Sequence, residues 1–153
     1  MGMGYVPQDP LHPDSSGAQF QGRERRGTSL RRDSRSNSDR VAARIARARW
    51  GEERAATWYR HNGYTVIARN WTMRGGELDV VARRGNVIVV CEVKTRANNN
   101  YGTPVDALTP TKQLRVRRAG FVFVRELNEK GLRVRFDVAA IVGTQLEIIE
   151  NAF

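Results

Sequence analysis

Two segments rich in β-branched residues, 77–84 and 87–95, flank the dipeptide Gly85-Asn86. A two-residue linker with glycine first is typical of a type II′ hairpin turn, because glycine tolerates the positive φ that this turn requires. The pattern therefore predicts a β-hairpin in which Arg84 pairs with Val87 and the remaining pairs follow in register.

Period-two alternation assigns the side chains of this hairpin to two faces. One face is predicted to be wholly apolar and carries Leu78, Val80, Ala82, Val89, Cys91 and Val93. The other face is apolar near the turn and charged at its far end, where Asp79 is expected opposite Glu92 and Glu77 opposite Lys94. The single cysteine is therefore predicted to be a buried thiol.

Two carboxylates that face each other on neighbouring strands need a compensating charge. At about 5 Å and an effective dielectric constant of about 20, they repel by about 3 kcal/mol. A raised pKa, the Lys94 ammonium group or a divalent cation would offset this repulsion, and Mg²⁺ prefers carboxylate and water oxygens. Asp79, Glu92 and Lys94 are thus candidates for a metal- and phosphate-binding site. The alternative is an ion-pair cluster at the margin of a sheet, with Glu77 as a supporting residue.

Residues 39–62 show an apolar period of 3.6 residues, which predicts a helix. Asp39 is a good N-cap for its start, and Gly63 follows its expected end at about Asn62. Its expected core-facing stripe is Val41, Ile45, Ala48, Glu52, Ala55 and Tyr59. Because burial of a lone charge is costly, Glu52 either lies at the edge of the stripe beside an arginine or has a partner at the hairpin. A metal ion or a metal-bound water would be such a partner.

A second helix is predicted to begin at Thr109-Pro110, since threonine is a good N-cap and proline is favoured at the first helical position, and to end near Asn128. Its core-facing stripe comprises Lys112, Val116, Ala119, Phe123 and Leu127. Lys112 is a candidate phosphate-binding residue because helix N-termini attract anions. The alternative is a surface lysine whose stem lies along apolar neighbours.

Further strands are expected at 64–71, 133–142 and 145–149. The resulting order α-β-β-β-α-β-β predicts an α/β fold with a mixed central sheet flanked by two main helices. The polar loop after the hairpin begins with Arg96, a second candidate phosphate-binding residue, and contains Tyr101, which could stack on a base or pack locally.

Residues 1–40 are rich in proline, serine, glycine and arginine, so they are predicted to form a disordered tail ahead of a folded domain at 41–153. The formal net charge is +10, and most of the excess belongs to the domain, which suits a polyanionic partner. A signal peptide is not expected, no stretch approaches transmembrane length, and no P-loop, dinucleotide motif or nucleophile elbow appears. Cytoplasm is the expected location.

An acidic residue early in one strand, followed by E-x-K in the next, resembles the PD-(D/E)XK nuclease superfamily, and the chain is more closely similar to the bacterial YraN-like family. Leu78 stands where the superfamily's name has proline. The matching pieces are Gly51-Glu52-Glu53-Arg54-Ala55-Ala56, Gly63-Tyr64, Asn70-Trp71, Gly76-Glu77-Leu78-Asp79, Glu92-Val93-Lys94-Thr95-Arg96, Tyr101-Gly102-Thr103-Pro104, Lys112 and Arg135-Phe136-Asp137-Val138.

This resemblance implies a restriction-endonuclease-like core in which Asp79, Glu92 and Lys94 are catalytic. It also implies that Asp79, Glu92 and Glu52 hold Mg²⁺ or Mn²⁺. The superfamily includes Holliday-junction resolvases, so the expected partner is nucleic acid, with branched DNA as a candidate substrate. The alternative is a non-catalytic nucleic-acid-binding or protein-interaction module that keeps the fold. The sequence favours neither a monomer nor a dimer.

Overall fold

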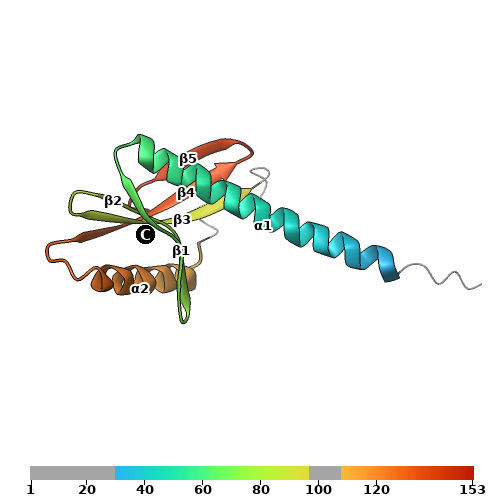
Figure 1. The fold of residues 1–153 in the computed structure, drawn as a ribbon, viewed down its shortest axis with the longest axis horizontal. Coiled ribbons are helices and arrows are strands. Elements are labelled where there is room, and N and C mark those ends of the chain that lie inside the picture. Colours follow the sequence, from blue (N-terminus) through green and yellow to red (C-terminus); the bar gives the residue numbers. More distant parts are fainter. Residues whose placement is uncertain (1–29, 97–107) are drawn as a thin grey trace, which may run out of the picture.

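The computed structural model describes residues 30–96 and 108–153, with side chains from residue 36 onward (Figure 1). Its elements are α1 Leu30–His61, β1 Thr65–Met73, β2 Gly76–Arg84, β3 Val87–Arg96, α2 Pro110–Glu126, β4 Arg133–Val142 and β5 Gln145–Ile149. The predicted order α-β-β-β-α-β-β and the α/β fold class are confirmed. No helix in the described ranges is long and apolar enough to cross a membrane.

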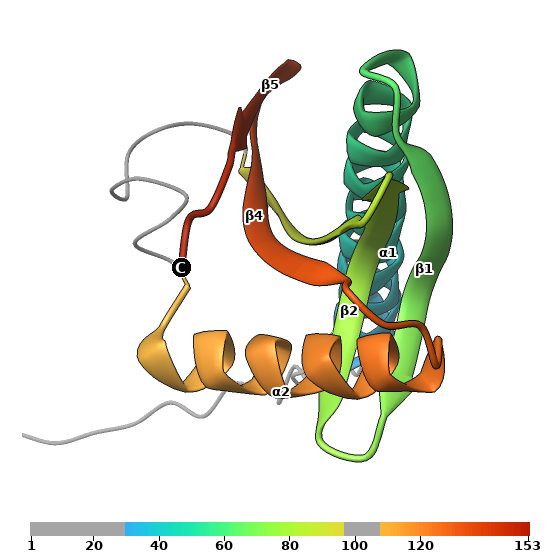
Figure 2. The same cartoon turned by 90° about the vertical axis from the view of Figure 1, so that its left-hand side faces the viewer.

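The five strands form one mixed sheet in the order β1-β2-β3-β4-β5. Only β3 and β4 are parallel, and α2 makes the crossover between them that parallel neighbours require. Helix α1 packs through Ala55, Ala56 and Tyr59 on one face of the sheet, and α2 packs through Val116 and Phe123 on the other. The helices cross these two faces in different directions (Figure 2). The result is a three-layer domain.

The hairpin turn has the predicted register. Arg84 pairs with Val87, and the ladder continues to the pair Val80–Cys91. Gly85 has φ of 60°, as the first turn residue of a type II′ turn requires. Cys91 is fully buried, as predicted.

The ladder between β2 and β3 stops at Val80–Cys91, so the prediction that Asp79 and Glu92 form a directly opposed pair was wrong. Beyond this point β2 pairs only with β1, through Leu78 opposite Trp71. A two-stranded ribbon twists more strongly than a wide sheet. Leu78 consequently packs in the cluster on the α2 side, not with Val80 on the α1 side as alternation predicted.

Helix α1 begins at Leu30, earlier than the predicted Asp39. Residues 36–50 are all exposed, including Val41 and Ile45, which were wrongly expected to face the core. This half of α1 extends beyond the sheet (Figure 1). Its alanines and arginines are strong helix formers, and helix propagates readily from the packed half, so burial is not needed. Residues 1–29 of the expected tail lie outside the described part of the chain.

Helix α1 crosses β3 in close contact at Gly51. A Cβ atom on Gly51 would lie 2.5 Å from Cγ2 of Thr95 and 3.2 Å from Cγ1 of Val93. Only glycine lets the helix lie this close to the side chains of Thr95 and Val93 without displacing them. Gly51 therefore fixes the height of α1 above the sheet and the positions of its neighbours Trp50 and Glu52.

We predict that Gly51→Ala destabilises the protein by about 1–3 kcal/mol, because overpacking outweighs the gain in helix propensity. Thr95→Ser removes the clashing methyl group, so the double variant should recover part of the loss. Urea unfolding of the two single variants and the double variant measures both effects. Equal or higher stability of Gly51→Ala would contradict the close-contact argument.

Candidate functional site

A cavity of about 300 Å³ lies where β2 and β3 separate, between α1 and α2; we call it the acidic cavity. It is lined by Ala48 and Glu52 of α1, Asn70 of β1, Glu77 and Asp79 of β2, Glu92, Val93, Lys94 and Thr95 of β3, and Lys112 of α2. The structure thus brings together all the predicted site residues except Arg96. Four carboxylic acids face two lysines there.

Glu92 lies at the centre of this arrangement and is only 2% exposed. Its Oε1 atom accepts a hydrogen bond from Lys94 Nζ at 2.7 Å and lies 3.3 Å from Lys112 Nζ. Its Oε2 atom is buried and has no hydrogen-bond partner within the described residues. A buried carboxylate oxygen without a partner is costly, so this atom marks a place for a ligand or a cation.

The Asp79 side chain supplies a hydrogen bond between β2 and β3 beyond the end of their backbone ladder. Its Oδ2 atom accepts a hydrogen bond from the backbone N–H of Val93 at 2.8 Å. Burial and the nearby Glu92 carboxylate raise the pKa of Asp79 to about 7, against the opposing effects of the Val93 hydrogen bond, Lys112 and Lys94. The site therefore holds two acids whose charges are incompletely compensated.

Lys112 lies at the N-terminus of α2 and lines the acidic cavity. Its position in the core-facing stripe of this helix predicted that it would point toward the site. The Thr109 side chain caps the helix by accepting from the Lys112 backbone N–H. The Lys112 ammonium group lies 3.2 Å from Glu77, which was expected to face Lys94. Burial acts to lower the pKa of Lys112, but Glu92 and Glu77 outweigh it, so the pKa is raised and the lysine stays charged.

Glu52 reaches the cavity from α1 and is 8% exposed. Its Oε2 atom accepts a hydrogen bond from Asn70 Nδ2 at 2.8 Å, and Arg69 lies 4.0 Å away. Asn70 has φ of 48°, a left-handed conformation that asparagine tolerates better than most residues. Sequence reasoning missed Asn70 as a site residue. An asparagine inside a predicted strand, where this residue is disfavoured, was the available signal.

The described residues contain no group of three or more His, Cys, Asp and Glu side chains arranged to hold a metal ion. The expected three-acid set Asp79, Glu92 and Glu52 therefore lines one cavity without forming a three-ligand cluster. Mg²⁺ often binds only one or two carboxylates together with substrate phosphate. The unpartnered Glu92 oxygen and the raised pKa of Asp79 fit a cation held by these two acids.

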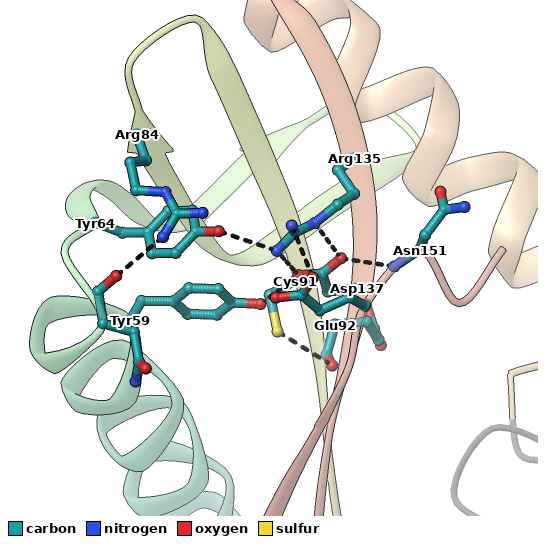
Figure 3. A network of polar contacts seen from close by, with 10 residues as sticks. Tyr59, Tyr64, Arg84, Cys91, Glu92, Arg135, Asp137 and Asn151 are labelled. Carbon is teal, nitrogen blue, oxygen red and sulfur yellow. Dashed lines mark hydrogen bonds and ion pairs between the residues drawn. The ribbon is translucent and has the colours of Figure 1, made fainter.

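Asp137, the acid of the Arg135-Phe136-Asp137-Val138 motif, lies outside the acidic cavity in a buried network (Figure 3). It is fully buried and accepts hydrogen bonds from Tyr59 Oη at 2.8 Å, from Arg135 at 2.8 and 2.9 Å, and from the Asn151 backbone. Burial raises the pKa of Tyr59 and of the adjacent Cys91. Both side chains stay protonated, and Asp137 joins α1 to the sheet.

A model of the uncharacterised protein family UPF0102 matches residues 51–141. A UPF0102 protein of Acidothermus cellulolyticus is 41% identical over 128 residues, covering 74% of this chain and 97% of that protein. A UPF0102 protein of Rhodococcus opacus is 40% identical over 118 residues, covering 74% and 100%. The chain belongs to family UPF0102.

The UPF0102 match includes nine of the ten residues that line the acidic cavity and leaves out Ala48. Membership confirms the expected YraN-like relationship, and the fold is compatible with the PD-(D/E)XK resemblance. The match begins at Gly51, so the exposed half of α1 lies ahead of it.

Arg96 contributes to a different cavity of this UPF0102 protein. That cavity, of about 510 Å³, is lined by Ala46, Arg47, Trp50, Thr95, Arg96, Gly143 and Thr144; we call it the Trp50 cavity. Arg96 is paired with Val142 at the end of β3, and its carbonyl accepts from Gly143 N–H. Its phosphate-binding role stays a prediction. Tyr101 lies outside the described residues.

The pKa of Asp79 predicts a pH dependence of stability. Between its unfolded value of about 3.8 and its folded value of about 7, the folded protein retains a proton that the unfolded chain releases. Asp79 therefore lowers the free energy of unfolding as pH rises through this window, and the loss is complete above about pH 7.

Asp79→Asn cannot ionise and keeps an oxygen acceptor for Val93. We expect its melting temperature, measured in EDTA, to fall less between pH 5 and pH 8 than that of the unchanged protein. Glu129→Gln, at an exposed acid paired with Arg83, is the matched control. Parallel melting curves for Asp79→Asn and the unchanged protein would refute the assignment.

Proposed function

We propose that this UPF0102 protein is a metal-dependent, nuclease-like protein that binds nucleic acid and hydrolyses its phosphodiester bonds. The observation that carries the proposal is the buried, unpartnered Oε2 atom of Glu92 beside Asp79 in a cavity that also holds two lysines. The two acids repel each other unless a cation lies between them, and the two lysines can bind the phosphate that the cation would contact.

Asp79 and Glu92 would hold Mg²⁺ or Mn²⁺. When bound, the ion supplies polarisation of the scissile phosphate and lowers the pKa of the attacking water. Glu52 is kept in the cavity by Asn70 and would accept a hydrogen bond from that water or from a metal-bound water. In this role Asn70 is a positioning residue.

Lys94 and Lys112 would act on the phosphate. Both ammonium groups now point at Glu92 Oε1, at 2.7 and 3.3 Å, and are therefore already aimed into the cavity. Lys94 would stabilise the negative charge that develops on the phosphate oxygens in the transition state. Lys112 would bind the phosphate from the N-terminus of α2.

The charge of the chain supports nucleic acid as the partner. Its formal net charge is +10, although the acidic cavity itself concentrates carboxylates. A net positive charge attracts a polyanion, and the acidic cavity would hold the cation that acts on it. We propose DNA, with branched DNA as the first substrate to test, and the cytoplasm as the compartment.

In the presence of Mg²⁺ or Mn²⁺ we predict cleavage of at least one of branched, single-stranded and duplex DNA. Glu92→Gln and Asp79→Asn should abolish cleavage, and Lys94→Gln should slow it by about a hundredfold or more, as loss of a transition-state charge partner does. Gel analysis of end-labelled substrates measures the products.

Glu53→Gln is the control for this assay. Glu53 follows Glu52 in the same helix but is exposed and pairs with Arg60 and Arg69 on the surface. Its removal should leave cleavage unchanged. Cleavage that survives both Asp79→Asn and Glu92→Gln would rule out the acidic cavity as the active site.

Metal binding can be tested without turnover. Isothermal titration calorimetry with Mn²⁺ should detect a site in the unchanged protein that is lost in Glu92→Ala and kept in Glu129→Ala, an exposed surface acid. Equal binding by Glu92→Ala would show that the cation lies elsewhere.

The ion pairs of Lys94 and Lys112 with Glu92 favour one second candidate, a nucleic-acid-binding module without turnover. In such a module the lysines would compensate Glu92 permanently. It would bind nucleic acid equally well with EDTA, with a strong salt dependence, and would cleave none of the three substrates.

A further inference from the structure

The Trp50 cavity and the acidic cavity lie on either side of α1 where it crosses β3. Thr95 lines both cavities, and its methyl group contacts α1 at Gly51. The residues that flank Gly51 belong to different cavities, Trp50 to one and Glu52 to the other. A ligand that extends over this crossing would therefore contact both cavities.

Trp50 is an exposed aromatic residue that is held by contacts with its neighbours. It lines the Trp50 cavity and is 39% exposed, although tryptophan is highly buried on average. The Arg54 guanidinium lies 5.4 Å from the indole centroid and donates a hydrogen bond to the Thr144 carbonyl at 3.0 Å. This contact links the indole of α1 to the β4–β5 turn.

A row of arginines leads along α1 to this tryptophan. Residues 40–50 contain four arginines and no acidic residue. Arg40, Arg44 and Arg47 recur at spacings of four and three residues, so they share one face of the helix, and all three are exposed. The same row on a second copy of the chain would repel it, whereas a phosphate backbone would bind.

Resting on the proposed function, we infer that the Trp50 cavity binds an unpaired nucleotide of the substrate strand. Trp50 stacks on the base, and Arg47 contacts its phosphate. Stacking on an aromatic residue beside arginines is the common mode of single-strand binding. A base inside a duplex has both faces covered by its neighbours, so only an unstacked base reaches Trp50. The cavity volume of about 510 Å³ is in the range of small-ligand sites.

The test measures binding in EDTA with Glu92→Gln as the parent, so that the probes stay intact. Fluorescence anisotropy compares a labelled oligothymidylate with a blunt duplex. Trp50→Ala should weaken oligothymidylate binding about tenfold, as loss of one stacked base does, and leave duplex binding unchanged. Trp50→Phe should retain most of the affinity because it keeps an aromatic face.

Phe121→Ala is the matched control, since Phe121 is an exposed aromatic residue on α2 that lines neither cavity. It should bind both probes as the parent does. Arg47→Gln should reduce the salt dependence of oligothymidylate binding by about one ion, compared with Arg118→Gln on the exposed face of α2.

Three outcomes would overturn the inference: no oligothymidylate binding by the parent, equal binding by Trp50→Ala, or an equal loss on the duplex probe. Trp50-dependent binding by a protein that never cleaves DNA would support the inference and count against the proposed hydrolysis alone. If Trp50→Ala cleaves DNA and binds oligothymidylate as well as the protein with Trp50 does, the result would count against the inference alone.

Discussion

The hydrogen bond from the Val93 backbone to the Asp79 carboxylate is the contact on which the acidic cavity depends. The β2–β3 ladder ends at the pair Val80–Cys91, so the partly buried N–H of Val93 needs another acceptor. Because a side chain serves as that acceptor, the strands can separate without leaving the amide unpaired. The space opened in this way admits the side chains of Glu52 and Lys112 from opposite helices.

Two buried acids of this protein show how a structural carboxylate differs from one available for chemistry. Both oxygens of Asp137 are satisfied, by Tyr59, Arg135 and the Asn151 backbone, so it has little capacity left for another ligand. Glu92 has both its lysine contacts on Oε1 and none on Oε2. Both acids lie within the motifs that match the family, and they differ in how many of their oxygens have hydrogen-bond partners.

Local signals in the sequence predicted the elements well. The turn at Gly85-Asn86 and the cap at Thr109-Pro110 depend on a few adjacent residues, and the structure has both. The gathering of Asp79 and Glu92 at one end of the hairpin followed from alternation. The end of their ladder did not, because it depends on the twist of β2 with β1. Twist similarly removed Leu78 from its expected face.

Features set by tertiary contacts were beyond pattern reasoning. The early start of α1 could not be predicted from an apolar stripe, because residues 36–50 are all exposed. The bond between Asn70 and Glu52 joins residues 18 positions apart, and it requires a left-handed residue inside a strand. Alternation along β3 predicts that Arg96 lies on the same face as Glu92 and Lys94. At the end of the strand, however, Arg96 lines the Trp50 cavity.

The contact of Gly51 with Thr95 also sets where the length of α1 can vary. One residue inserted between Trp50 and Tyr59 would turn the preceding helix by about 100° relative to the packed half, and would move the tryptophan or the glutamate away from its cavity. Residues added before Arg40 would only lengthen the projecting end, by about 1.5 Å each. Within this one helix, insertions and deletions are therefore tolerable upstream of the crossing and disruptive at it.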